Sequence, residues 1–151
     1  MFEKTQEVNE MTITLNELLF EIRLSINKIK FCKDQLNILQ VNLESLVKFY
    51  AESELMPEVE QYQNKFIVYR ELSDKLIKES KSIRNKTTES KVEKTEDLDS
   101  EILEEFDKFK ILCKDYFTFF EDLKKNFIHF YTSYHVSENH IAVKDKKISD
   151  F

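Results

Sequence analysis

The chain has 151 residues, of which 34% are charged and 41% hydrophobic, and its formal net charge is −6. Average usage predicts roughly 11 glycines and roughly 8 prolines at this length, whereas the chain contains 0 and 1. Glycine supplies the positive φ angles of phosphate-binding loops, dinucleotide fingerprints and tight hairpins, so the composition disfavours all of these. An acidic chain is also a poor candidate for nucleic-acid binding, where a basic stripe is the usual footprint.

Targeting signals and cysteine usage suggest where the protein resides. The N-terminal residues lack the basic and apolar segments of a secretion signal, and no apolar run is long enough to span a bilayer. We therefore expect an intracellular, cytoplasmic protein, including one held at the cytoskeleton or an organelle, that is neither secreted nor transmembrane. Cys32 and Cys113 are expected to be reduced, buried thiols rather than a disulfide.

The first expected helix covers about residues 6–52 and has apolar residues at two positions of a seven-residue repeat. One position holds Val8, Leu15, Ile22, Ile29, Leu36, Leu43 and Tyr50. The other holds Met11, Leu18, Ser25, Cys32, Leu39, Leu46 and Ser53. This repeat is typical of a coiled-coil seam. A second apolar row on the opposite side of the helix holds Ile13, Phe20, Leu24, Phe31 and Ile38. A helix that is apolar on two faces is expected to contact neighbours on both.

Two further helices are expected. The second covers about residues 57–84 and begins at Pro57, because proline is tolerated in the first turn of a helix. The polar residues 85–98 are expected to form a flexible linker. The third helix covers about residues 99–136, and residues 137–151 are expected to form a polar tail. The seam residues of the third helix are Ile102, Phe106, Phe109, Cys113, Tyr116, Phe120, Leu123, Phe127, Phe130 and Tyr134. The apolar stripe is widened by Leu112, Phe117, Phe119 and Tyr131.

Together these patterns predict an all-α fold. We expect an elongated antiparallel bundle, or coiled coil, of three long helices in one domain over residues 1–136, with a mobile linker before the last helix. The first helix would be the longest, so part of its seam would project uncovered, and this predicts a partner. Alternatively, the first helix bends near Asn27 or Asp34 and folds back, giving a compact four-helix bundle that covers its own seam.

No catalytic, metal or cofactor site is expected. His129, His135 and His140 are not spaced by the three or four residues that bring two ligands onto one helical face. The chain has neither the Glu-x-x-His pattern of di-iron bundles nor the Cys-x-x-Cys pattern of zinc sites. Cys113 lies within a seam, where a buried thiol is inert.

The expected function is that of a non-enzymatic coiled-coil subunit that assembles with other helical proteins. Such subunits occur in kinetochore, spindle and vesicle-tethering scaffolds, and a hetero-oligomer is favoured over a homo-oligomer. The expected partner contacts are Phe20, Leu24, Phe31 and Ile38. The alternative is a peripheral-membrane or lipid-handling module that uses a basic patch of Lys78, Lys81, Arg84, Lys86, Lys91 and Lys94. No segment resembles a known family strongly enough to carry a function across.

Overall fold

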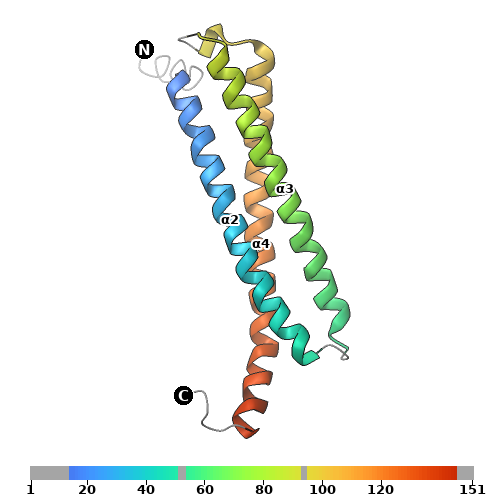
Figure 1. Ribbon diagram of the computed structural model, residues 1–151. Helices are drawn as coiled ribbons and strands as arrows, with labels where there is room; N and C mark the ends of the chain where they lie inside the picture. The colour runs from blue at the N-terminus through green and yellow to red at the C-terminus, as the bar shows by residue number, and fades with distance from the viewer. Residues whose placement is uncertain (1–13, 51–53, 93–94, 146–151) are drawn as a thin grey trace, which may run out of the picture. The chain divides into compact units, whose positions relative to one another are not determined.

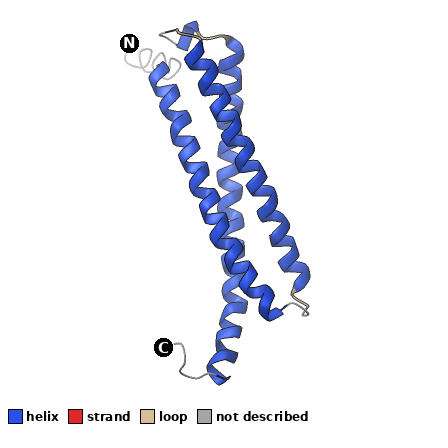
Figure 2. Ribbon diagram, in the orientation of Figure 1, coloured by secondary structure: helices blue, strands red, loops and turns tan. Residues whose placement is uncertain are grey.

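The computed structural model describes residues 14–50, 54–92 and 95–145, without the side chains of residues 50, 95 and 135–145. These residues form three long helices, α2 (Leu15–Tyr50), α3 (Met56–Glu89) and α4 (Ser100–Asp145). A short 3-10 helix, η1 (Thr95–Asp97), lies between α3 and α4. The described ranges contain no strand (Figure 2), so the all-α fold predicted from the sequence is confirmed.

The chain divides into two compact units, each built from a segment of every long helix. The first unit joins the described residues up to Phe31 with Ser73–Tyr116. The second unit joins Cys32–Leu72 with the described residues from Phe117 onward. Within each unit α3 runs antiparallel to α2 and α4 (Figure 1), as the predicted three-helix bundle requires.

The first turn of α2 is closed by a capping box. The Thr14 hydroxyl accepts a hydrogen bond from the Glu17 amide at 3.2 Å, and the Glu17 carboxylate accepts one from the Thr14 amide at 3.4 Å. From Leu15 the helix continues without interruption through Asn27 and Asp34. The alternative four-helix bundle, which needs a bend there, is therefore not adopted. The expected helix start near residue 6 lies outside the described residues.

Most of the heptad positions predicted for the first and third helices form the core, whereas Leu15, Ser25, Ile102 and Tyr134 are only half-buried. The buried residues of α2 include Leu18, Ile22, Ile29, Cys32, Leu36, Leu39, Leu43 and Leu46. Those of α4 are Phe106, Phe109, Cys113, Tyr116, Phe120, Leu123, Phe127 and Phe130. Leu112 and Phe119, which were expected to widen the α4 stripe, are instead about half exposed, at 47% and 58%. Each directly precedes a buried seam residue, Cys113 or Phe120, and so lies about 100° away from it around the helix axis, at the edge of the buried face.

Aromatic rings dominate the packing of the second unit. The ring centroids of Tyr62 and Phe130 lie 5.0 Å apart, and those of Phe66 and Phe127 lie 5.1 Å apart with a T-shaped geometry. Tyr62 also meets Phe127 edge-on at 5.3 Å. Burial raises the pKa of the Tyr62 hydroxyl, and the nearby Glu58 carboxylate raises it further. These rings therefore join α3 to α4 through contacts at the distances that favour aromatic pairs.

Small hydroxyl residues replace apolar ones in the part of α3 that belongs to the first unit. Ser73, Ser80 and Thr87 recur at seven-residue intervals and are all fully buried. Ser80 donates a hydrogen bond to the Ile77 carbonyl at 2.6 Å, and Thr87 donates one to the Ile83 carbonyl at 2.7 Å. The Ser73 and Tyr116 hydroxyls share a hydrogen bond of 2.5 Å. The seven-residue repeat of buried positions therefore continues through polar residues, whose hydropathy does not indicate burial.

Two sequence-based boundaries differ from the structure, and the first follows from this repeat. Residues 85–89, which were assigned to the linker, belong to α3, because Thr87 continues its buried face. The mobility expected for the rest of the linker stays a prediction. Residues 137–145, which were assigned to the polar tail, continue α4 to Asp145.

The helix lengths also differ from the expectation. Within the described residues α2 has 36 residues and α3 has 34, so the excess length of the first helix is not found there. The longest helix is α4, with 46 residues. Whether part of the seam of the first helix projects uncovered stays a prediction, because residues 1–13 lie outside the described residues. Among the described residues, the argument for a partner depends on the second apolar row.

The end of α3 uses an unusual residue. Lys91 has a φ of 56°, a left-handed conformation that glycine usually adopts at the end of a helix. Its amide donates a hydrogen bond to the Thr88 carbonyl at 3.4 Å. Because the chain contains no glycine, a side chain with a Cβ atom occupies this position. The next helix, α4, begins where the Asp99 carboxylate accepts a hydrogen bond from the Glu101 amide at 3.2 Å.

Candidate functional site

The four residues expected to contact a partner all lie on the surface of α2. Phe20, Leu24 and Phe31 belong to the first unit and are 57%, 51% and 61% exposed. Ile38 belongs to the second unit and is 62% exposed. Ile13, the first member of the predicted row, lies outside the described residues. The structure therefore places all four residues in solvent, as their spacing along the helix requires.

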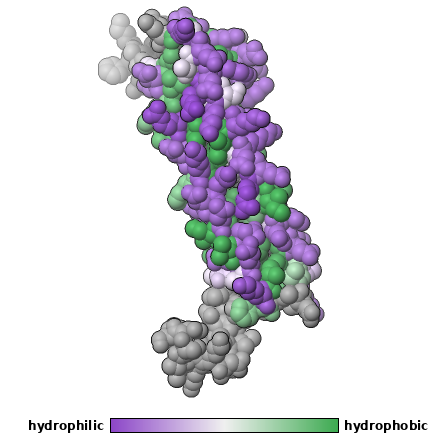
Figure 3. All heavy atoms as spheres, in the orientation of Figure 1, coloured by the Kyte–Doolittle hydropathy of each residue, from purple (hydrophilic) through white to green (hydrophobic). Residues whose placement is uncertain are grey.

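In the first unit this row lies on the side of α2 that faces away from the core. At about 100° per residue, Phe20, Leu24 and Phe31 fall within about 40° of one another around the helix axis. Ile22 and Ile29, which are completely buried, point to the opposite side. Patches of hydrophobic residues are visible among the hydrophilic ones on the face in Figure 3. We call Phe20, Leu24 and Phe31 the α2 row.

Charged residues line the two edges of the α2 row. Arg23 and Lys30 are exposed and lie seven residues apart, so both fall on the same edge. The other edge carries Glu21 and Lys28, one charge of each sign. Asn27 is exposed between Leu24 and Phe31 and interrupts the row with a polar side chain. An apolar strip with charged edges and one polar member has the arrangement of a coiled-coil contact face.

Other exposed hydrophobic side chains were not predicted as contacts. The first unit has two on α4, Ile111 and Leu112. The second unit has Val41, Phe49, Ile67, Val68, Phe119 and Ile128. On α2, Phe49 follows Ile38 by 11 residues, the same interval that separates Phe31 from Phe20, so the sequence already contained this spacing. The residues that precede Ile111 on α4 are mostly charged, so no apolar repeat in the sequence indicated that Ile111 is a contact.

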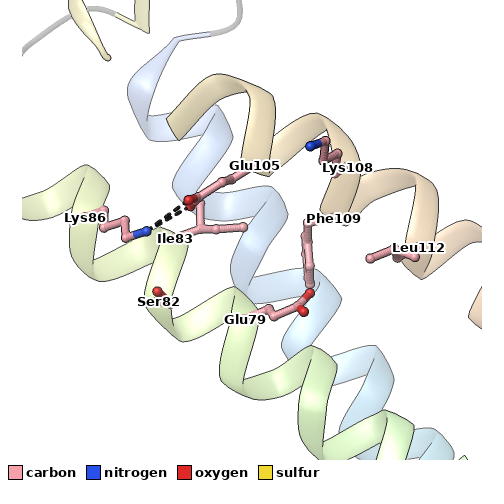
Figure 4. A pocket seen from close by; sticks show the side chains of 8 residues that line it. All are labelled: Glu79, Ser82, Ile83, Lys86, Glu105, Lys108, Phe109 and Leu112. Atoms are coloured by element: carbon pink, nitrogen blue, oxygen red, sulfur yellow. Dashed lines mark hydrogen bonds and ion pairs between the residues drawn. The ribbon is translucent and has the colours of Figure 1, made fainter. Parts of the chain in front are cut away.

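A shallow hollow of about 330 Å³ lies between α3 and α4 in the first unit (Figure 4). The buried residues Ile83 and Phe109 line it together with Leu112. At one end Lys86 donates hydrogen bonds to both carboxylate oxygens of Glu105, at 3.0 and 3.2 Å. This contact raises the pKa of Lys86. Lys86 was expected to belong to a basic lipid-binding patch, but its charge is already paired within the protein.

Both cysteines lie outside the lining of this hollow, and no histidine lines it. Cys32 and Cys113 are both buried, and they form no disulfide. The pKa of the Cys113 thiol is raised to about 12, mainly by burial. The Glu79 carboxylate also raises this pKa, and Lys28 lowers it. At neutral pH this thiol is protonated, and the protonated form is not the nucleophile.

The described residues contain neither a metal-binding cluster nor a helix that could cross a membrane. Among them, no three histidine, cysteine, aspartate or glutamate side chains lie close enough together to hold a metal ion. Within the same residues, no helix combines the length and the apolar character that crossing a membrane requires.

Comparison with known proteins gives no further indication of function. No family model matches the chain, and neither the curated proteins nor the solved structures include a significant match.

Proposed function

We propose that the protein is a non-enzymatic helical subunit that binds another helical protein through the outer face of α2. The single observation that carries this proposal is the α2 row, whose three large apolar side chains are more than half exposed. Exposed apolar residues in a contiguous arrangement are typical of interaction sites. Ile38, in the second unit, is also exposed and is proposed as a partner contact of that unit.

Two features support the α2 row as the contact face for a protein helix. The row follows the heptad spacing of a coiled-coil seam, in which each side chain inserts between four residues of the facing helix. The outward positions of α3 in the first unit are polar, among them Lys75, Lys78 and Ser82, so α3 offers no competing apolar face there. Assembly with a different helical protein, in a scaffold of the kinetochore, spindle or vesicle-tethering kind, belongs to this proposal.

The test compares two charge substitutions at equally exposed positions. Phe31→Glu places a carboxylate in the α2 row, and Ile111→Glu places one on α4 of the same unit, where the parent side chain is also 61% exposed. The tagged full-length chain would be purified from cells under native conditions, and the proteins bound in near-equal amounts quantified by mass spectrometry. We expect Phe31→Glu to lose these proteins and Ile111→Glu to keep them.

Helicity by circular dichroism should be unchanged in both variants, because both substitutions lie on the surface. Retention of the same proteins by Phe31→Glu would contradict the assignment of the contact to α2. A chain that is recovered alone in its unsubstituted form would contradict the proposed assembly with other proteins.

A further inference from the structure

The segment of α2 that carries the row has an excess of positive charge. From Phe20 through Phe31 the sequence contains Arg23, Lys28 and Lys30 against one acidic residue, Glu21, and the next acidic residue is Asp34. Arg23 and Lys30 lie on one edge of the α2 row, both are exposed, and no ion pair within the described residues involves either of them. Glu21 lies on the opposite edge of the row, so within the first unit neither cation has an acidic neighbour on its own edge of α2.

The position of these two cations corresponds to a known element of helix pairing. In a coiled coil, the residues that flank the apolar seam form ion pairs between the helices and decide which helices associate. Arg23 and Lys30 are seven residues apart and lie roughly a quarter turn from the α2 row, as flanking positions do. A facing helix with basic residues there would place like charges together, which is unfavourable.

A membrane surface fits this face less well than a helix does. Helices that lie in the lipid interface bury a broad apolar face. The α2 row is narrow, about 40° around the axis, and Asn27 lies within its length. A polar residue of this kind is common in coiled-coil seams, where it fixes the register.

Building on the proposed function, we infer that the partner of the α2 row is an amphipathic helix with acidic residues along the edge that faces Arg23 and Lys30. The apolar residues of the row supply the contact area, and the two cations select the partner by charge. The same charges would accelerate association at low ionic strength, because they steer an acidic helix toward this face.

The inference can be tested with two synthetic helices about three heptads long that share one leucine seam. One carries glutamate at every flanking position and the other carries lysine, so neither pairs readily with itself. Binding of each labelled helix to the full-length chain is measured by fluorescence anisotropy at low and high salt. Vesicles of phosphatidylcholine with about 30% phosphatidylserine serve as the membrane probe.

We expect the acidic helix to bind about tenfold more tightly than the basic helix at low salt, from two flanking contacts. The preference should shrink at high salt because exposed charges are screened. The double variant Arg23→Glu with Lys30→Glu should reverse the preference. The matched double variant Lys75→Glu with Lys81→Glu, which makes the same charge change at exposed positions of α3, should leave it intact.

The outcomes separate this inference from the proposed function. Equal binding of the two helices, lost in Phe31→Glu but unaffected by the Arg23 and Lys30 changes, would overturn the acidic partner and leave the helical partner standing. Binding of neither helix would overturn both. Vesicle binding that depends on Arg23 and Lys30, without binding of either helix, would overturn the protein partner in favour of a membrane.

Discussion

The buried hydrogen bond between Ser73 and Tyr116 allows a quantitative test of the core of the first unit. Ser73 is fully buried and Tyr116 is 2% exposed, and their hydroxyl oxygens lie 2.5 Å apart. Tyr116→Phe and Ser73→Ala each remove one hydroxyl and deprive the other of this bond inside the core. Removing one partner of a buried hydrogen bond costs about 1–3 kcal/mol.

We expect each single substitution to lower the free energy of unfolding by about 1–2 kcal/mol. The lower part of the range applies because each of the two residues also takes part in another interaction, so neither depends on this bond alone. The double variant removes both hydroxyls together, so it should lose less than the sum of the single losses. The resulting coupling energy should be about 1 kcal/mol, within the range of residues in direct contact.

The assay is urea denaturation of the four proteins followed by circular dichroism, with the slope of each transition compared as well as its midpoint. A constant slope shows that the substitutions change stability without changing how much surface unfolding exposes. Additive losses, with no coupling between the two substitutions, would refute the conclusion that the two hydroxyls stabilise the unit through their mutual bond.

Three further predictions concern single positions. The raised pKa of Cys113 stabilises the folded chain below about pH 9, and this contribution should disappear as the pH rises toward 12; Cys113→Ala should show a smaller loss of unfolding free energy over that interval. Lys91→Gly should raise the unfolding free energy by about 1 kcal/mol because it relieves a left-handed conformation, whereas Lys91→Ala should not, as their urea midpoints would show. Phe127→Ala should cost about 3–5 kcal/mol in the same assay, since it removes a buried ring from an aromatic cluster. Phe119→Ala, at a ring that is 58% exposed, should cost far less, and equal losses would contradict this view of the core.

Heptad periodicity predicted the fold and the burial of its main residues. Ile22 and Phe120 are buried and Phe31 is exposed because helical geometry alone decides which positions share a face. That same geometry predicted the exposure of the residues proposed for partner contact. Whether a partner covers them depends on a second molecule, which one chain's periodicity does not describe.

The end of α3 was predicted less well and the capping box at Thr14 was missed, for two physical reasons. Thr87 is buried because its hydroxyl bonds to the backbone of the preceding turn, so a polar residue can continue an apolar face. Thr14 and Glu17 have the spacing of a capping box, but the heptad pattern runs through this position and gives no sign of it. Local hydrogen bonds of both kinds can be predicted from a sequence only when residue spacing and side-chain chemistry are considered together.

The hydroxyl residues of α3 have a consequence for the response to temperature. One heptad position of this helix is occupied by Val59 and Phe66 in the second unit and by Ser73, Ser80 and Thr87 in the first. Exposure of apolar surface raises the heat capacity on unfolding by about 0.45 cal/mol/K per Å², whereas polar surface lowers it by about 0.26. The contribution of this heptad position to the stability curve is therefore flatter in the first unit than in the second. On cooling, the packing of α3 through Val59 and Phe66 should weaken more steeply than its packing through the hydroxyl residues.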